Sequence, residues 1–377
     1  MQILVLIYEF PPVGGGGGRV AEDICRGLVQ RGHGVLVLTS HLEGLPRQEN
    51  RDGIEILRVP VGRKYPFEAG FLDMFGYILS GFMPGLRLTK QWKPDVVHVH
   101  FAVPSGALAW LLSKLTGLPY ILTAHLGDVP GGVPEKTDRW FRWVYPFTPP
   151  IWKAAAKIFG VSEFTRSLVK EHYSLDIGVI PNGVDLKMLD PGPITVGAPP
   201  RIIFAGRFVG QKNPVQIVRS LATLQDLHWE CVMVGDGHLR PAVEAEIARH
   251  NLENRFTLTG WITPDEVVDW FARSDILFMP SLSEGLPVVG VQALAMGLAI
   301  VASQVGGFVD LVEPGQNGYL LDEQSETIGV DELRTLLSDP VQLTSCREAS
   351  RRLATRFDVE QIISAYEHAL REVASSR

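Results

Sequence analysis

Charged residues stand beside turns that follow two apolar runs of the sequence. Arg207 and Lys212 come directly after the run 201–205, and Glu284 follows the run 275–279. Two cations at the end of a parallel strand are well placed to neutralise a diphosphate, because each contact at ~4 Å contributes ~4 kcal/mol before desolvation. The residue types therefore indicate a phosphate site, although a solvated surface pair explains the two cations equally well when they are taken alone.

The segment 283–307 adds a second feature suited to phosphate. Pro287 is expected at the first position of a helix, where its missing N–H would have no partner anyway. The N–H groups of Val288 and Val289 would then be free at the positive end of the helix dipole, which is an arrangement that binds anions. The helix is expected to end near Gly297 and to lead into a buried strand.

A membrane span is the main alternative for this region, because 285–309 contains no charged residue and is long enough to cross a bilayer. Five glycine and proline residues interrupt it, and Gln292, Ser303 and Gln304 would need hydrogen-bond partners in lipid. No cluster of Lys or Arg flanks either end. A helix followed by a core strand therefore explains the region better.

A run of five glycines, 14–18, follows the first apolar run and precedes a helical pattern. Such a loop lets the backbone approach a ligand closely, at a conformational cost of about 0.5–1 kcal/mol per glycine. Gly16, Gly18 and Ala21 also satisfy a relaxed dinucleotide fingerprint. No acidic residue follows the next strand at 38–40, so a nicotinamide enzyme is disfavoured; a flexible loop without a ligand is the other alternative.

The order of elements predicts two doubly wound parallel-sheet α/β domains that face each other across a cleft. A Pro- and Gly-rich stretch over 181–200 separates them. We expect domains over 1–180 and 181–357, and a last helix over 358–377 that begins at Asp358 and packs back on the first domain. The expected strands are 2–8, 35–39, 54–59, 95–100, 119–124, 157–161, 177–180, 201–205, 230–235, 256–259, 275–279, 299–302 and 319–321.

Composition narrows the class of protein. The 377 residues carry a net charge of −7, and residues 181–377 hold 26 acidic against 16 basic side chains, which disfavours nucleic-acid binding. The three cysteines have no paired spacing, so neither a disulfide framework nor a zinc site is expected. The N-terminus lacks the basic start and cleavage site of a signal peptide, so we expect a cytoplasmic protein.

An ordered set of short motifs runs through nearly the whole chain, and through it the sequence resembles the family 4 retaining glycosyltransferases, which have the GT-B fold. No single motif is very specific, but the ordered set is. The motifs are the glycine loop, GHGV at 32–35, PDVVHVH at 94–100, TAHLGD at 123–128, VSE at 161–163, PNGVD at 181–185, Gly206-Arg207 with Lys212, GDG at 235–237, and Pro280-Ser281 leading to Glu284.

The resemblance implies roles for individual residues on the donor side. In similar enzymes the loop matching Gly15 and Gly16 approaches the donor phosphates, and the pair matching Arg207 and Lys212 neutralises the departing diphosphate. The carboxylate matching Glu284 binds the hydroxyls of the transferred sugar. The segment after it contributes backbone groups that hold phosphate oxygens, here Gly285, Leu286, Pro287, Val288 and Val289; Trp261 and Ile262 would line the base pocket.

The acceptor side is expected in the first domain. The histidine matching His125 lies at the reacting centre of similar enzymes, and His100 and Asp128 are weaker candidates for acceptor contacts. A lone histidine after an apolar strand is commonly structural, but the place of His125 at the carboxyl end of its strand, before Gly127 and Asp128, favours a functional role. We interpret His98 as structural. We expect His98 and His100 to point to opposite faces of their strand.

The segment that carries the resemblance also departs from it. Similar enzymes usually have a second glutamate eight residues after the first, in contact with the donor ribose, and Gln292 occupies that position here. A neutral hydrogen bond contributes ~0.5–1.5 kcal/mol where a charged one contributes ~1.5–3 kcal/mol. Altered ribose binding is therefore expected.

Two segments of the first domain could contact the acceptor or a membrane surface. One is the uncharged run 74–86, followed by Arg87, Lys90 and Lys93, and the other is 139–153, which mixes aromatic and basic residues. Neither is long enough to cross a bilayer, but each could lie in its interface. Buried helices explain both segments about as well.

The resemblance thus implies a glycosyltransferase that moves a sugar, with retention, from a UDP- or GDP-sugar to a lipid-linked, polysaccharide or small-molecule acceptor, as in cell-envelope polysaccharide synthesis. No cofactor or metal is expected, because Arg207, Lys212 and a helix N-terminus can stabilise the leaving group. Two alternatives remain, a nucleotide-sugar epimerase of the same fold and a non-catalytic nucleotide-sugar binding protein.

Overall fold

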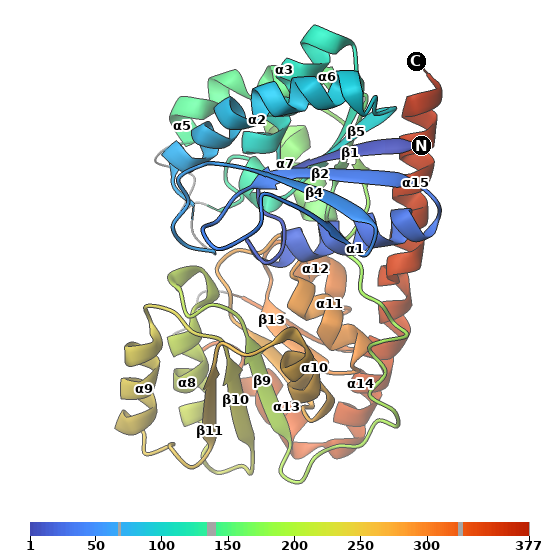
Figure 1. The fold of residues 1–377 in the computed structure, drawn as a ribbon. Coiled ribbons are helices and arrows are strands. Elements are labelled where there is room, and N and C mark those ends of the chain that lie inside the picture. Colours follow the sequence, from blue (N-terminus) through green and yellow to red (C-terminus); the bar gives the residue numbers. More distant parts are fainter. Residues whose placement is uncertain (67–68, 134–140, 323–326, 377) are drawn as a thin grey trace. The chain divides into compact units, whose positions relative to one another are not determined.

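The chain forms two compact units in the computed structural model, which describes residues 1–66, 69–133, 141–322 and 327–376. Unit 1 consists of Met1–Gly183 together with Val359–Arg377, and unit 2 consists of Val184–Asp358 (Figure 1). Each unit has its own parallel sheet, so the predicted fold class, two doubly wound α/β domains, is confirmed.

Unit 1 is built on an eight-stranded sheet in the order β3-β4-β2-β1-β5-β6-β7-β8, parallel except where β3 pairs with β4. The apolar strands lie where the sequence predicts them. Only β3 was missed, because its sequence QENR is polar and shows no apolar pattern. The strands are β1 (Gln2–Ile7), β2 (Gly34–Ser40), β3 (Gln48–Arg51), β4 (Ile54–Val59), β5 (Val96–His100), β6 (Tyr120–Ala124), β7 (Lys157–Gly160) and β8 (Gly178–Val179).

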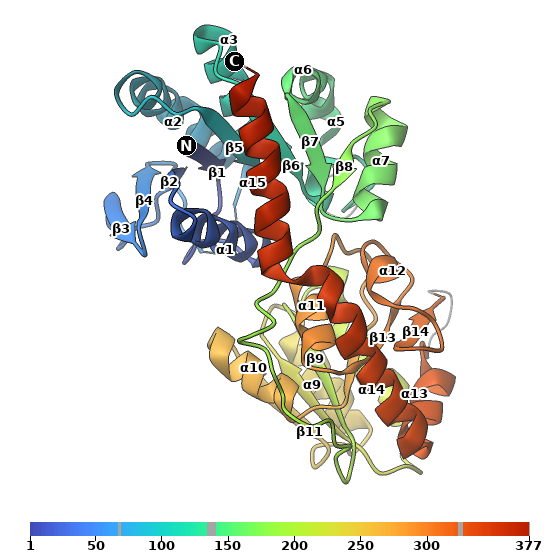
Figure 2. The same cartoon turned by 90° about the vertical axis from the view of Figure 1, so that its right-hand side faces the viewer.

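Helices cover both faces of this sheet (Figure 2). The face that carries Leu4, Leu6 and Val97 packs against α2, α3 and α6 in one hydrophobic core, and α1 and α15 cover the other face. The helices of unit 1 are α1 (Gly16–Gln30), α2 (Phe71–Gln91), α3 (Ala107–Thr116), α5 (Phe141–Val144), α6 (Pro149–Ala154), α7 (Glu163–Tyr173) and α15 (Val359–Ser375).

Unit 2 has a six-stranded sheet in the order β11-β10-β9-β12-β13-β14, and all its pairs are parallel. Its strands are β9 (Arg201–Ala205), β10 (Glu230–Val234), β11 (Phe256–Gly260), β12 (Ile276–Met279), β13 (Ala299–Ser303) and β14 (Gly318–Leu321). Its helices are α8 (Pro214–Ala222), α9 (Arg240–Arg249), α10 (Pro264–Ala272), α11 (Val288–Ala295), α12 (Phe308–Leu311), α13 (Val330–Ser338) and α14 (Pro340–Ala354).

The uncharged stretch 285–309 resolves into α11 and the fully buried strand β13, so the interpretation as a helix and core strand is confirmed. Gly297, just beyond α11, has a φ of +65°, a left-handed conformation that ends the helix there. Within the described part of the chain, no helix is both long and apolar enough to cross a membrane.

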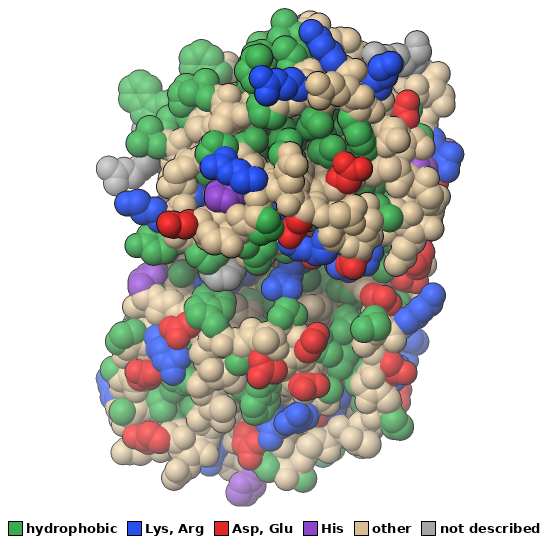
Figure 3. All heavy atoms as spheres, viewed as in Figure 1, with side chains coloured by type: hydrophobic (Ala, Val, Ile, Leu, Met, Phe, Trp, Pro, Cys, Tyr) green, Lys and Arg blue, Asp and Glu red, His purple; other side chains and the backbone are tan. Residues whose placement is uncertain are grey.

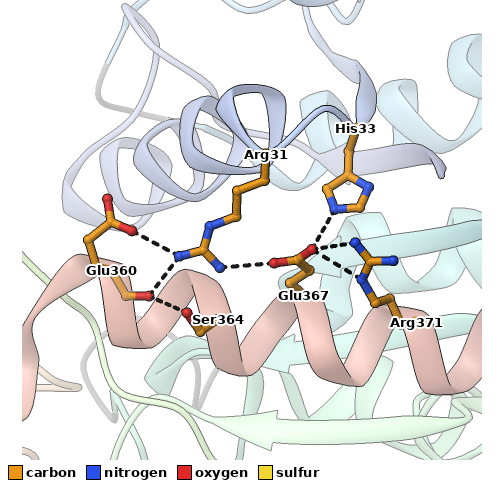
Figure 4. A network of polar contacts seen from close by, with 6 residues as sticks. All are labelled: Arg31, His33, Glu360, Ser364, Glu367 and Arg371. Carbon is orange, nitrogen blue, oxygen red and sulfur yellow. Dashed lines mark hydrogen bonds and ion pairs between the residues drawn. The ribbon is translucent and has the colours of Figure 1, made fainter.

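The last helix, α15, returns to unit 1 and is held there by a polar network (Figure 4). Glu367 accepts hydrogen bonds from Arg31 Nη1 and His33 Nε2, both at 2.9 Å, and from Arg371 of its own helix. These donors, His33 first, lower the pKa of Glu367 to about 2. Close packing adds to the contact, because a Cβ on Gly27 of α1 would lie 2.2 Å from Ile363 Cδ1.

The substitution Glu367→Gln is expected to destabilise unit 1 by about 1.5–3 kcal/mol, the range for hydrogen bonds to charged groups. The folded-state pKa of Glu367 lies below the unfolded value of ~4.3. Its contribution is therefore complete above that value and is lost as the pH falls towards about 2. Thermal unfolding at a series of pH values tests this: the gap between wild type and variant should close in acid, and a gap that is independent of pH would contradict it.

Candidate functional site

Two loops that follow neighbouring strands of unit 2 are tied together at the carboxyl ends of β9 and β12. Gln211, in the loop after β9, accepts a hydrogen bond from the Leu282 N–H at 2.8 Å through its backbone carbonyl. Its side-chain amide donates to the Ser283 carbonyl at 3.0 Å. Parallel sheets of this kind bind ligands at this edge. Gln211 is thus a residue that the sequence interpretation missed, because a single glutamine in a loop carries no recognisable signal.

The structure brings together Lys212 and Glu284, which were predicted as site residues. Lys212 Nζ lies 2.5 Å from Glu284 Oε1, and the Glu284 carboxylate is buried. Arg207 is half-buried and, among the described residues, makes no ion pair. The loop edge therefore holds one paired cation, one unpaired cation and one carboxylate.

The start of α11 supplies two free backbone donors beside this cluster. Pro287 was expected at the first helical position, and this is wrong by one residue: with a ψ of 121° it is the N-cap, and its carbonyl accepts from the N–H groups of Gly290 and Val291. The N–H groups of Val288 and Val289 donate to no group that the structure describes. Free N–H groups at a helix start favour an anion, as predicted.

The glycine pair 306–307 fixes the backbone around Glu284. Gly306 has a φ of +55°, and a Cβ placed on it would lie 1.5 Å from the Glu284 carbonyl oxygen. A Cβ on Gly307 would lie 2.0 Å from the Gly285 carbonyl oxygen, and the Gly307 N–H donates to the Glu284 carbonyl at 3.3 Å. Sequence reasoning treated these glycines only as interruptions of an apolar run, and it missed this packing.

The remaining donor-side residues divide between α11 and the far edge of the sheet. Gln292 is half-buried on α11, one turn after Val288. Leu286 is buried next to the N-cap of that helix. Trp261 and Ile262 follow the edge strand β11, which β10 separates from β9, and the Trp261 side chain is exposed. The structure thus places Trp261 and Ile262 at the same edge of the sheet but two strands away from Arg207.

In unit 1 the glycine run forms the first turn of α1. The helix begins at Gly16, three residues earlier than predicted, with Gly15 as its N-cap. A Cβ on Gly15 would meet no atom within 4 Å, so this backbone is open. A Cβ on Gly17 would lie 3.0 Å from the Phe101 ring and 3.3 Å from His125. The structure therefore brings the glycine loop against His125.

His125 is buried against its neighbours rather than exposed. Its ring stacks on Phe101 with the centroids 4.2 Å apart, and its Nε2 atom is buried without a hydrogen-bond partner among the described residues. Burial lowers the pKa of His125 to about 4. The ring is therefore neutral at pH 7.

Asp128 holds the His125 loop in place. Its carboxylate accepts hydrogen bonds from the backbone N–H groups of His125 and Ala102, both at 2.8 Å, and of Val103 at 3.4 Å. Burial raises the pKa of Asp128 to about 7, against the effect of these donors. The structure thus gives Asp128 a positioning role, because its oxygens are directed at the protein backbone.

The expectation that His98 and His100 point to opposite faces is wrong. Residues two apart on a strand share a face, and their ring centroids lie 4.3 Å apart. Both face α15, where the Tyr366 ring lies 4.8 Å from His98. His100 is buried with neither ring nitrogen bonded to a described residue, 5.9 Å from His125 between ring centroids.

The segment 139–153 divides between the core and the surface. Arg139 and Trp140 lie outside the described residues, as do the side chains of 141 and 142. Trp152 is buried and stacks on Tyr173 with the ring centroids 4.5 Å apart. Trp143 and Phe147 are exposed.

Among the residues with described side chains, no group of three or more His, Cys, Asp or Glu could hold a metal ion.

Family comparisons identify the chain. The sequence profile described as Glycosyltransferase Family 4 matches residues 14–188, and the profile described as Glycosyl transferases group 1 matches residues 194–353. The chain belongs to glycosyltransferase family 4. It is therefore an enzyme that transfers a sugar. The family that the ordered motifs indicated from the sequence is confirmed.

Curated relatives of this glycosyltransferase align over nearly all of its length. The 2-deoxystreptamine glucosyltransferase of Streptomyces kanamyceticus is 28% identical over 374 residues, covering 89% of this chain and 93% of that protein. The D-inositol 3-phosphate glycosyltransferase of Xylanimonas cellulosilytica is 27% identical over 391 residues, covering 94% and 91%. These relatives share the enzyme class with this chain.

Solved structures establish the GT-B fold. The sucrose-phosphate synthase of Thermosynechococcus elongatus has a TM-score of 0.89 at 19% identity and covers all of both chains. Anabaena Alr3699/HepE in complex with UDP-glucose has a TM-score of 0.75 at 18% identity, again over all of both chains. At these identities the likeness concerns the fold alone.

The packing of Gly306 on Glu284 is tested by Gly306→Ala, with Gly315→Ala as the matched control. Both glycines have a positive φ, +55° and +79°, but a Cβ on Gly315 meets no atom within 4 Å. The control is expected to lose about 1–2 kcal/mol of unfolding free energy from backbone strain alone. Gly306→Ala should lose about 1–3 kcal/mol more through overpacking, and equal losses in denaturant unfolding would contradict this account.

Proposed function

We propose that this glycosyltransferase moves a sugar with retention of anomeric configuration from a nucleotide-sugar, UDP- or GDP-linked, to a hydroxyl of its acceptor, without a metal ion. The observation that carries the proposal is the cluster in unit 2. There the Lys212–Glu284 pair, the unpaired Arg207 and the free N–H groups of α11 follow neighbouring strands. The fold neighbour that holds UDP-glucose supports a nucleotide-sugar as donor.

The donor would exchange partners with the ion pair. Lys212 and Arg207 neutralise the diphosphate together with the N–H groups of Val288 and Val289, and the Glu284 carboxylate accepts hydrogen bonds from the sugar hydroxyls. Lys212 keeps a partly exposed side chain, so its ammonium group can turn from the carboxylate to a phosphate oxygen. Donor binding then replaces the Lys212–Glu284 ion pair by two sets of charge-assisted hydrogen bonds. Lys212 donates to the diphosphate, and Glu284 accepts from the sugar hydroxyls.

The chemical step breaks the bond between the anomeric carbon and the phosphate oxygen while the acceptor oxygen bonds to the same face of that carbon. The leaving phosphate oxygen takes the acceptor's hydroxyl proton, so no protein nucleophile is needed. Negative charge develops on the diphosphate, where Arg207, Lys212 and the α11 donors are already in place. Preorganised donors of this kind typically contribute about 3–4 kcal/mol each to the transition state.

The acceptor is assigned to unit 1, near the glycine loop and His125. The ring of His125 is neutral at pH 7, so it can orient a hydroxyl group without attracting the donor's phosphates. The relatives' names specify 2-deoxystreptamine and D-inositol 3-phosphate. Their chemistry supports a polyhydroxylated acceptor for this chain, either free or linked to a lipid or polysaccharide of the cell envelope.

Anomer-resolved proton NMR of the product tests the proposed stereochemistry. Donors are first ranked by the thermal stabilisation that UDP-, GDP- and ADP-sugars give, and the best one is incubated with candidate acceptors in buffer with and without EDTA. The expected product keeps the donor's anomeric configuration, and EDTA does not change the rate. An inverted product would refute retention, and loss of turnover in EDTA would refute metal independence.

Gln292→Glu tests the ribose contact. A carboxylate on α11 would form a charged hydrogen bond where the amide forms a neutral one, so the donor KM is expected to fall about tenfold. Gln316→Glu is the matched control, because it adds the same charge at an exposed turn of unit 2. If both variants leave the donor KM unchanged, Gln292 does not contact the ribose.

A further inference from the structure

Helix α2 of unit 1 carries several large apolar side chains on its exposed side. Leu72, Phe75, Leu79 and Met83 are 81%, 50%, 62% and 52% exposed. Their spacing of three, four and four residues places them along one stripe of the helix. We call these four residues the α2 stripe. Figure 3 shows hydrophobic side chains gathered at the upper left of the molecule, the part of the view where Figure 1 labels α5 and α2.

The face of α2 that packs inward combines two glycines with Tyr77 and with partly buried apolar side chains, Met74, Phe82, Leu86 and Leu88. Gly81 and Gly85 are buried, and a Cβ on them would lie 2.9 Å from Leu108 and 2.8 Å from Leu112. Tyr77 anchors the same face through a hydrogen bond from its hydroxyl to the Leu38 carbonyl at 2.8 Å. The glycines bring α2 close to α3, and the four large side chains of the α2 stripe remain exposed, where a surface helix usually carries polar residues.

Positive charge continues the stripe at the C-terminal end of the helix. Arg87 and Lys90 follow Met83 by four and seven residues, and both are exposed, as is Lys93 just beyond the helix. Among the described residues none of these three cations has an ion-pair partner. The only acidic residue of α2, Asp73, lies in its first turn, where it accepts the Gly70 N–H at 2.9 Å.

We propose that the α2 stripe and its three cations dock unit 1 on an anionic phospholipid surface. An apolar stripe ending in unpaired cations matches a bilayer interface, where acyl chains lie beneath negative headgroups. A second copy of the chain fits less well. In a symmetric pair of α2 helices the cations would meet either each other or the apolar stripe, and α2 offers no free carboxylate to pair with them.

This inference goes beyond the proposed function, because sugar transfer needs no membrane, but it would place unit 1 beside lipid-linked acceptors. Vesicle binding requires neither donor nor acceptor. A lack of vesicle binding would therefore say nothing against the proposed transfer reaction. A lack of sugar transfer would likewise say nothing against the proposed docking surface.

The test is flotation of the full chain with vesicles of phosphatidylcholine alone or mixed with phosphatidylglycerol. Wild type is expected to float with the mixed vesicles at low salt and to be released by high salt. The double variant Leu72→Gln, Leu79→Gln should weaken binding at least about tenfold through lost apolar burial. Each of Arg87→Gln and Lys90→Gln should weaken it about fivefold.

Val341→Gln on α14 of unit 2 is the matched control, since Val341 is 80% exposed and Leu72 is 81% exposed. All these variants should keep the wild-type melting temperature, because the altered side chains are exposed. No flotation with mixed vesicles, or flotation that the stripe variants do not change, would overturn the proposal. A dimer in light scattering that the stripe variants dissociate, without vesicle binding, would instead assign the stripe to a second copy and would also overturn it.

Discussion

The site in unit 2 depends on the buried contact between Lys212 and Glu284. A carboxylate taken out of water needs a counter-charge, and the Lys212 ammonium group at 2.5 Å supplies it. Glycines 306 and 307 allow the backbone at Glu284 to sit in its position, and Gln211 ties together the two loops that carry the pair. A ligand with both a diphosphate and hydroxyl groups can satisfy both charges at once, which is the exchange of partners that the proposed donor binding requires.

Unit 1 differs from unit 2 in that its buried polar groups include the uncharged rings of three histidines. Asp128 uses its carboxylate to fix the backbone at His125, and burial keeps the rings of His98, His100 and His125 neutral by lowering the pKa of each. The helix α15 closes this face and is fastened by Glu367. The interior histidines of unit 1 are thus neutral, whereas the loops of unit 2 carry the charged side chains of Arg207, Lys212 and Glu284.

Much of this could be predicted from the sequence, because buried parallel strands are continuous apolar runs and the family's motifs lie at their ends. Strand β3 could not, since QENR shows no apolar pattern. The error on His98 and His100 arose from misapplying strand periodicity, and that on Pro287 from the one-residue difference between an N-cap and a first helical position. The contacts of Asp128 with Ala102 and Val103, and the packing of Gly306 on Glu284, join residues far apart in sequence and become visible only in the fold. That α2 would turn its glycines inward was equally hidden, because an apolar run does not show which side faces the core.

The most direct test of the central claim is calorimetric titration of Glu284→Gln with the best-stabilising nucleotide-sugar and with its nucleoside diphosphate. If the pair exchanges partners on donor binding, the variant frees Lys212 and should bind the diphosphate at least as tightly as wild type. It should bind the nucleotide-sugar about 10- to 100-fold more weakly, because the sugar loses its charged hydrogen bonds. Equal weakening of both ligands would contradict the claim and would make the Lys212–Glu284 pair a purely structural contact.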